Sequence, residues 1–171
     1  MKDAQSCPGP VIMDADVLID FIKVDRNILR SIVKYVGQVL VLGDTVEKVR
    51  DVRSEDELTE LGLTVILPDF RDAFAATSMS GRISYDDWLC FLTARRNECR
   101  CASNNKHLRS ACIREGIPVI WGIELLAMLA ESGGISKEKA LSTAAAISKI
   151  NPYITNDILE SLAEKLGLRG Y

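Results

Sequence analysis

The chain has 171 residues, of which 47% are hydrophobic and 26% are charged. This composition excludes wholesale disorder and fits one domain with a small appendage. Its 21 Lys and Arg residues against 24 Asp and Glu give a net charge of −3, which excludes tight, sequence-blind binding of nucleic acid by bulk positive charge. The polar start lacks the apolar core of a signal peptide, and no stretch approaches the roughly 20 apolar residues of a membrane span. We therefore expect a cytoplasmic protein that does not bind membranes.

Short apolar runs alternate with segments of helical periodicity along the first part of the chain. The apolar runs predict five strands, at residues 11–13, 39–42, 63–67, 99–102 and 117–120. Helices are expected between them, over residues 27–36, 45–52, 69–76, 84–97 and 106–115. The spacing of Ser54 and Glu57 fits a capping box that opens a further short helix. The alternation predicts an α/β fold, a doubly wound five-stranded parallel sheet flanked by helices.

The pattern changes after Trp121, where only helical segments follow. They cover residues 124–131, 137–149 and 154–166, and are separated by Gly133-Gly134 and Asn151-Pro152. We therefore expect a sheet domain over residues 8–121. A helical C-terminal extension over residues 122–171 is expected to pack on the same domain.

The cysteines bear on both compartment and metal chemistry. Their number is odd and no secretory signal precedes them, which favours reduced thiols. The pair Cys99 and Cys101 lacks zinc-site spacing, and the only histidine is His107. The cysteines are therefore interpreted as small buried apolar residues rather than metal ligands: Cys7, Cys90, Cys99, Cys101 and Cys112.

Acidic residues follow several of the predicted strands. Ligands of open α/β sheets bind outside the carboxyl ends of the strands, so these residues can meet at one edge. Asp14 and Asp16 follow the first strand, Asp44 and Glu47 the second, and Asp69 the third; Ser103, Asn104 and Asn105 follow the fourth, and Asp86 and Asp87 open a helix. A carboxylate cluster repels itself unless a cation joins it. Oxygen ligands without His or Cys favour Mg²⁺ or Mn²⁺.

Several of these acids have a simpler explanation. Asp44, Asp69 and Asp86 are interpreted as helix caps, turn formers or solvated surface residues, as Asp commonly is at such positions. Asp14 differs because it directly follows an apolar run, where a charge is unfavourable unless it is paired or liganded. Asp16 fits either a cap or a supporting role.

Four segments carry motif-like patterns in a fixed order. Residues 12–19 read IMDADVLI, residues 44–49 DTVEKV, residues 83–89 ISYDDWL and residues 101–109 CASNNKHLR. Together they resemble the motifs of the PIN-domain family, metal-dependent ribonucleases that include the VapC-type toxins. The helical tail is similar to the extension of some toxin-like members, in which residues 122–126 would follow the last strand.

The resemblance implies a set of site residues. It places metal-binding acids at Asp14, Glu47 and Asp87, with Asn105 at the position of a fourth acid. Ser103 matches a small hydroxyl residue that orients the site. Two further acids would support the cluster, Asp16 beside the first acid and Asp86 beside the third. The implied activity is hydrolysis of RNA phosphodiesters by metal-bound water, with Mg²⁺ or Mn²⁺ as cofactor.

Asn105 departs from the family pattern because an amide brings no negative charge to the metal. This leaves a second interpretation, a catalytically degenerate PIN-like module that binds RNA or a protein. A third is a haloacid-dehalogenase-like phosphatase with Asp14 as nucleophile, although no later strand end supplies its pair of acids. A phospho-receiver domain would require a lysine where the fifth strand instead ends on Trp121.

The resemblance also implies partners. A toxin of this class would pair with a small antitoxin protein and commonly form a homodimer. Helices that carry Phe21, Ile22, Leu29 and Phe74 are candidate antitoxin contacts, with core packing as the alternative. The basic groups that would contact RNA are local rather than global: Lys48, Arg50, Arg95, Arg96, Lys106 and Arg109.

Overall fold

The computed structural model describes residues 9–168. Five strands form one sheet: β1 (Val11–Met13), β2 (Val39–Leu42), β3 (Thr64–Ile66), β4 (Arg100–Ala102) and β5 (Val119–Ile120). The strand order is β3-β2-β1-β4-β5 and every pair is parallel. The predicted fold class, a doubly wound parallel α/β sheet flanked by helices, is confirmed. Cys7 and the ends of both predicted segments, at residues 8 and 169–171, lie outside the described residues.

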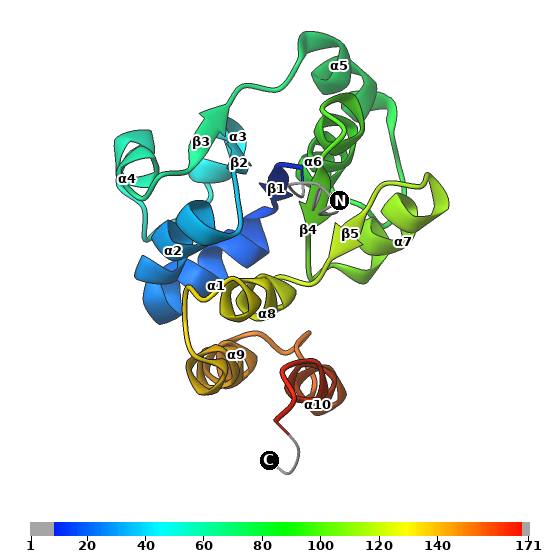
Figure 1. Ribbon diagram of the computed structural model, residues 1–171. Coiled ribbons are helices and arrows are strands. Elements are labelled where there is room, and N and C mark those ends of the chain that lie inside the picture. The colour runs from blue at the N-terminus through cyan, green and yellow to red at the C-terminus, as the bar shows by residue number, and fades with distance from the viewer. Residues whose placement is uncertain (1–8, 169–171) are drawn as a thin grey trace, which may run out of the picture.

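Ten helices connect and cover the strands in the described part of the chain (Figure 1). Seven precede the last strand: α1 (Ala15–Asp25), α2 (Asn27–Tyr35), α3 (Gly43–Val46), α4 (Glu55–Glu60), α5 (Phe70–Ser78), α6 (Tyr85–Arg96) and α7 (Lys106–Arg114). Three follow it: α8 (Glu124–Glu131), α9 (Lys137–Ile150) and α10 (Asn156–Lys165). In Figure 1, α9 and α10 lie beyond α8, on the side away from the sheet.

The sheet is buried on both faces because its strands alternate between two apolar clusters. Val11 and Met13 of β1 belong to one cluster, together with residues of α1, α2, α8 and α9. Ile12, between them in sequence, belongs to the other cluster with residues of α6 and α7. The two-residue period of a strand produces this alternation, and burial on both faces explains why the strands are almost wholly apolar. The extension helices thus share a core with the sheet.

The predicted helix over residues 45–52 is wrong beyond Val46. Helix α3 ends there, and turns with bonds three residues apart follow: the amide of Val49 donates to the carbonyl of Val46 at 3.1 Å, and that of Val52 to Val49 at 3.0 Å. The β-branched residues Thr45, Val46, Val49 and Val52 disfavour a regular helix because the preceding turn restricts their side chains. Burial of these side chains stabilises the turns instead.

The predicted capping box does not form, although its helix does. Ser54 is the N-cap of α4 but its side chain makes no capping hydrogen bond. Glu57 instead accepts from the amide of Arg53, one residue before the N-cap, at 3.0 Å, and pairs with the guanidinium of Arg26. The Glu57 carboxylate is thus bound by Arg26 and Arg53 and does not accept from the amide of Ser54, as a capping box requires.

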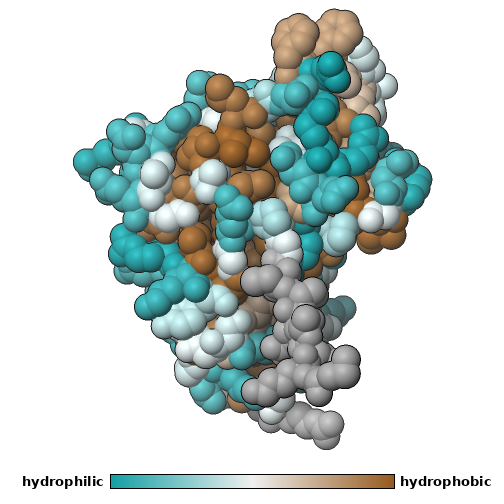
Figure 2. Space-filling model, turned by 45° about the horizontal axis from the view of Figure 1, so that its top comes forward, coloured by the Kyte–Doolittle hydropathy of each residue, from teal (hydrophilic) through white to brown (hydrophobic). Residues whose placement is uncertain are grey.

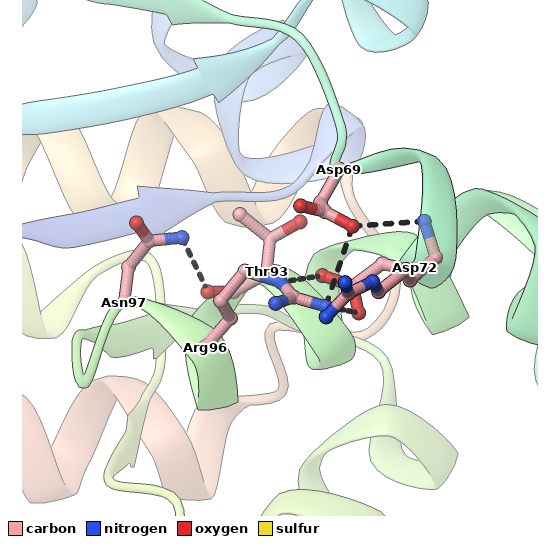
Figure 3. Close-up of polar contacts among 6 residues, drawn as sticks. Asp69, Asp72, Thr93, Arg96 and Asn97 are labelled. Carbon is pink, nitrogen blue, oxygen red and sulfur yellow. Dashed lines mark hydrogen bonds and ion pairs between the residues drawn. The ribbon is translucent and has the colours of Figure 1, made fainter.

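Helices α5 and α6 are joined by an ion pair between the buried carboxylate of Asp72 and the partly exposed side chain of Arg96, drawn in Figure 3. The guanidinium of Arg96 donates two hydrogen bonds of 2.6 Å to the carboxylate of Asp72, and lies 3.5 Å from Asp69. Asp69 is also the N-cap of α5, as its interpretation as a cap predicted. The charge of Asp72 raises the pKa of Arg96 through these hydrogen bonds. The fork fixes α5 against the sheet layer.

Of the four proposed antitoxin contacts, three are core residues. Phe21, Ile22 and Leu29 are at most 5% exposed, so the alternative of core packing holds for them. Of the four, only Phe74 is exposed, at 67%. It lies in α5 near two other exposed apolar residues, Phe70 of the same helix and Leu67 just before it. Figure 2 shows a group of tan, apolar side chains projecting at the top of that view, the end of the molecule at which α5 lies in Figure 1.

Candidate active site at the carboxyl ends of the strands

Asp14 lies at the end of the central strand β1 and is almost fully buried, at 4% exposure. Its carboxylate caps α1 by accepting from the amide of Val17 at 2.9 Å, and it also accepts from the Ser103 side chain. Burial raises the pKa of Asp14 to about 7, with a smaller contribution from the charges of Asp16 and Asp87. The hydrogen bonds from Ser103 and Val17 act in the opposite direction. In the described residues, no lysine or arginine forms an ion pair with Asp14.

Asp16 and Asp87 complete an acidic cluster with Asp14. Although Asp16 is an exposed residue of the first turn of α1, burial of its carboxylate and then the charge of Asp87 raise its pKa. Asp87 stands in the first turn of α6, where the Ser84 hydroxyl accepts from its amide at 3.2 Å. Two helix N-termini therefore bring the three carboxylates to one edge of the sheet. Their positive dipole ends partly offset the repulsion between the acids.

Asn105 joins this cluster with its amide in a defined orientation. Its Oδ1 accepts from the amides of His107 and Leu108, at 2.9 and 3.4 Å, and so caps α7. Its Nδ2 consequently faces Asp87 and donates to Oδ2 at 3.0 Å. Backbone amides can only donate, so the two capping bonds fix which end of the side chain is oxygen. Asn105 thus presents a donor, not a ligand oxygen, to the acidic cluster.

The remaining predicted residues lie apart from this arrangement. Glu47 follows α3 and is exposed, and its side chain makes no hydrogen bond or ion pair within the described part of the chain. Asp86 pairs with Lys48, which holds the segment after α3 against the start of α6. The structure therefore brings together Asp14, Asp16, Asp87, Ser103 and Asn105. It leaves Glu47 at the surface and gives Asp86 a partner.

A second buried network, which the sequence did not indicate, supports the site from behind. Asp20 of α1 accepts from Asn104 at 3.0 Å and from Asn151 at 2.7 Å. Asn104 in turn accepts from the amide of Gly122 at 3.0 Å. A Cβ at Gly122 would lie 2.9 Å from both methyl groups of Val17, so only glycine allows this approach.

The network fixes Asn104, which lies between the site residues Ser103 and Asn105, and thereby positions the segment that follows β4. Burial raises the pKa of Asp20 to about 6, and the hydrogen bonds from Asn151 and Asn104 oppose this rise. Polar residues on an otherwise buried helix face were the available signal. This signal is weak because Asp20 is four residues after Asp16, so the sequence alone places both residues on the polar face of the amphipathic helix α1.

Arg109 provides the basic group near the cluster. Its guanidinium stacks 4.0 Å from the centroid of the Trp121 ring and donates to the carbonyl of Ser103 at 3.2 Å. Partial burial lowers the pKa of Arg109, while the charges of Glu124 and Asp14 raise it. The cation is thus held by a ring and a carbonyl beside the acids, rather than by a carboxylate.

The donor set agrees in chemistry with a hard divalent cation, because Asp14, Asp16 and Asp87 offer only carboxylate oxygens. The raised pKa values of Asp14 and Asp16 agree with this, because the charge of a bound cation would stabilise both carboxylates and lower both pKa values. As placed, however, no three His, Cys, Asp or Glu residues in the described part converge closely enough to hold an ion. Because the oxygen of Asn105 faces α7 and its amide nitrogen faces Asp87, the described residues do not form a preformed ion centre.

Four cysteines are buried, as their interpretation as small apolar residues predicts. Cys90, Cys101 and Cys112 lie in the apolar cluster between the sheet, α6 and α7, and Cys99 just precedes β4. The Sγ atoms of Cys90 and Cys101 are 3.6 Å apart. Burial raises the pKa of Cys99.

Comparison with protein-family models, with curated proteins and with solved structures finds no match for this chain. Over residues 9–168, the helices are too short or too polar to cross a membrane.

Proposed function

We propose that the chain is a PIN-like, metal-dependent endoribonuclease that hydrolyses RNA phosphodiester bonds with Mg²⁺ or Mn²⁺. The observation that carries the proposal is Asp14, a buried carboxylate without a cationic partner, beside Asp16 and Asp87. A fold does not retain such an arrangement for stability, because the charge is unfavourable without a ligand. The order of the motif segments and the parallel sheet support the family assignment.

In this proposal the side chains have separate tasks. Asp14 and Asp87 would hold the ion, Asp16 would add charge at the rim, and Glu47 could join only from the surface. When bound, the ion would activate a water molecule and stabilise the leaving oxygen. The Ser103 side chain orients Asp14, and Asn105 orients Asp87. Arg109 supplies a positive charge for the RNA backbone at the same edge.

As a nuclease of this class, the chain would be the cytoplasmic toxin of a toxin–antitoxin pair and would form a homodimer. Its partner would be a small antitoxin protein. Of the four side chains suggested for that contact, Phe74 alone is exposed. Co-expression with the product of a small neighbouring gene, followed by co-purification, tests this part of the proposal.

A specific observation favours a second candidate function, an RNA- or protein-binding module that no longer cleaves. The amide of Asn105 donates to Asp87 where a fourth acid would accept a metal, and the contact occupies one oxygen of Asp87. A hydrogen bond thus partly does what the ion would do, namely stabilise the negative charge of Asp87.

One experiment separates the two functions. Cleavage of a mixed RNA panel is measured with Mg²⁺, with Mn²⁺ and with EDTA, for the wild type, Asp14→Asn and Asp87→Asn. Asp56→Asn is the matched control, because Asp56 is an exposed acid of α4. We expect metal-dependent cleavage that falls at least about 100-fold in both site variants and is unchanged in the control.

The other outcomes decide against the nuclease. Activity that persists in both site variants would overturn the site assignment. RNA binding without cleavage in any metal would favour the binding module. The absence of cleavage, RNA binding and a metal-induced rise in Tm would contradict the nuclease and the RNA-binding module, and would leave protein binding as the function to test.

A further inference from the structure

A small basic cavity lies beside the acidic cluster, between α6, α7 and the connection that precedes α6. Its volume is about 270 Å³, and it is lined chiefly by Ser80, Arg82, Trp88, His107, Ser110 and Arg114. In the connection, Gly81 adopts a φ of 115°, which lets the chain turn so that both of its neighbours line the cavity. The cavity is therefore built from two stretches of the chain, residues 80–88 and residues 107–114.

The charge of this cavity is opposite to that of the chain. Two arginines and the histidine line it and no Asp or Glu does, although the whole chain carries a net charge of −3. Arg82 makes no ion pair within the described residues. Within residues 9–168, Arg114 forms an ion pair only with its neighbour Glu115, at 4.0 Å and at the exposed surface, where such pairs are weak. Both guanidinium groups are thus available to an anion.

The wall of the cavity also contains a buried donor without an acceptor. Trp88 is 8% exposed, and its Nε1 has no hydrogen-bond partner in the described part of the chain. The ring is held edge-on against Phe91, with centroids 5.4 Å apart and planes at 88°. Buried N–H groups nearly always find an acceptor in a folded protein. This nitrogen is closed to solvent, so it reports on an anion held by the neighbouring arginines rather than donating to that anion.

The position of the cavity indicates which anion it takes. Trp88 directly follows Asp87, and His107 is two residues beyond Asn105. The side chains of Asn105 and Asp87 touch at 3.0 Å, so the N-terminal ends of α6 and α7, the two helices that line the cavity, meet at the acidic cluster. A nucleic-acid strand bound at the acids would therefore run close to the cavity. Arginine forks and N–H groups match the oxygens of a phosphate.

We propose that this cavity is a phosphate-binding site that takes one phosphate group of a nucleotide, with the guanidinium groups of Arg82 and Arg114 as its donors. That the phosphate belongs to an RNA strand rests on the function proposed above. Phosphate binding itself does not, because neither arginine belongs to the acidic cluster.

The indole N–H resonances in a ¹H–¹⁵N NMR spectrum test the site directly. The chain has two tryptophans, and the Trp88→Phe variant assigns their signals. Inorganic phosphate, a 5′-mononucleotide and a short single-stranded RNA are titrated in EDTA, so that no metal takes part. The Asp14→Asn variant is titrated in parallel, to test whether phosphate binding in the cavity is independent of the acidic cluster.

We expect saturable movement of the Trp88 signal, with little movement of the Trp121 signal. Arg82→Ala and Arg114→Ala should each weaken binding about tenfold. Arg30→Ala is the matched control, since Arg30 is an exposed arginine of α2, and it should bind as the wild type does. Tighter binding of RNA than of the mononucleotide identifies a strand as the source of the phosphate, and the reverse identifies a free nucleotide.

Two results would overturn the proposal. The first is a Trp88 signal that stays in place up to about 10 mM of all three probes, a concentration above the Kd of even weak sites. The second is a signal that moves equally in Arg82→Ala, Arg114→Ala and Arg30→Ala, which would show a general ionic effect. Neither result bears on RNA cleavage, so this inference and the proposed nuclease activity can fail separately.

Discussion

Two buried carboxylates of this protein are held in opposite ways. Asp72, between α5 and α6, is 6% exposed and accepts both hydrogen bonds of the Arg96 fork (Figure 3). Asp14, at the end of β1, is 4% exposed, and its donors among the residues that the structure describes are a backbone amide and the Ser103 side chain. A carboxylate paired with arginine contributes to the structure. A carboxylate that lacks a cation at a strand end marks the region where the fold retains an unfavourable charge, as functional sites commonly do.

The largest expected effect comes from breaking the structural pair. Arg96→Ala leaves Asp72 buried without its partner, and we expect Tm to fall by about 10 °C. Arg95→Ala removes the neighbouring exposed arginine and is the matched control, with a shift within about 2 °C. Thermal unfolding followed by circular dichroism measures both. Equal shifts in the two variants would show that the fork contributes nothing beyond surface charge.

At Asp14 we expect the opposite effect, a substitution that raises Tm. At pH 8 the folded protein carries this charge at a buried position, so Asp14→Asn should raise the free energy of unfolding by on the order of 2 kcal/mol. This corresponds to a rise in Tm of about 6 °C. Asn keeps an acceptor for the amide of Val17. Asp16→Asn, at an exposed position, should change Tm less.

The pH dependence of stability sharpens this prediction. The pKa of Asp14 is about 7 in the folded protein, against an ordinary value of 3.8. Between these two values the folded protein binds more protons than the unfolded chain, so this group's contribution to stability falls as pH rises through the interval. Urea unfolding from pH 4 to pH 8 should therefore show a difference between Asp14→Asn and the wild type that grows with pH. A constant difference would contradict the raised pKa.

A smaller effect is expected at the network behind the site. Asn151→Leu removes the 2.7 Å donor to Asp20 and leaves Asn104 as its remaining side-chain donor. The loss of a hydrogen bond to a buried carboxylate should lower Tm by about 4 °C. Asn97→Leu, which removes an amide that donates to the carbonyl of Thr93 four residues earlier, is the control for a local contact. Equal losses would show that the Asp20 network adds nothing.

The smallest effect is expected in the metal-induced change in Tm of the acidic cluster. Asn105→Asp replaces the amide donor by a fourth carboxylate and should tighten Mn²⁺ binding about tenfold, equivalent to about 3 °C more metal-induced stabilisation. In EDTA the same variant should be less stable than the wild type, because another like charge joins Asp87. Differential scanning fluorimetry with and without Mn²⁺ measures both. A variant that is destabilised equally in both conditions would show that the cluster does not bind the ion.

The sheet was predictable because burial on both faces makes a strand such as β2 wholly apolar, while the helices around it keep polar sides. Asp14 was predictable for the same reason, since a charge directly after a buried run is conspicuous. The orientation of Asn105 was not, because it depends on which of two groups caps α7. The surface position of Glu47 was missed because the turns after Val46 replace the expected helix. Asp20 was missed because its donors lie up to 131 residues away in sequence.

That separation has a consequence for synthesis on the ribosome. Strand β1 lies in the middle of the sheet, yet its neighbour β4 begins at Arg100 and the last donor to Asp20 is Asn151. The pairing of β1 with β2 can form early, but the other edge of β1 waits for β4 and the carboxylate of Asp20 waits for Asn151. Contacts this distant slow folding. We expect a nascent chain that leaves one edge of β1 unpaired until β4 has been made, which exposes apolar residues to chaperones.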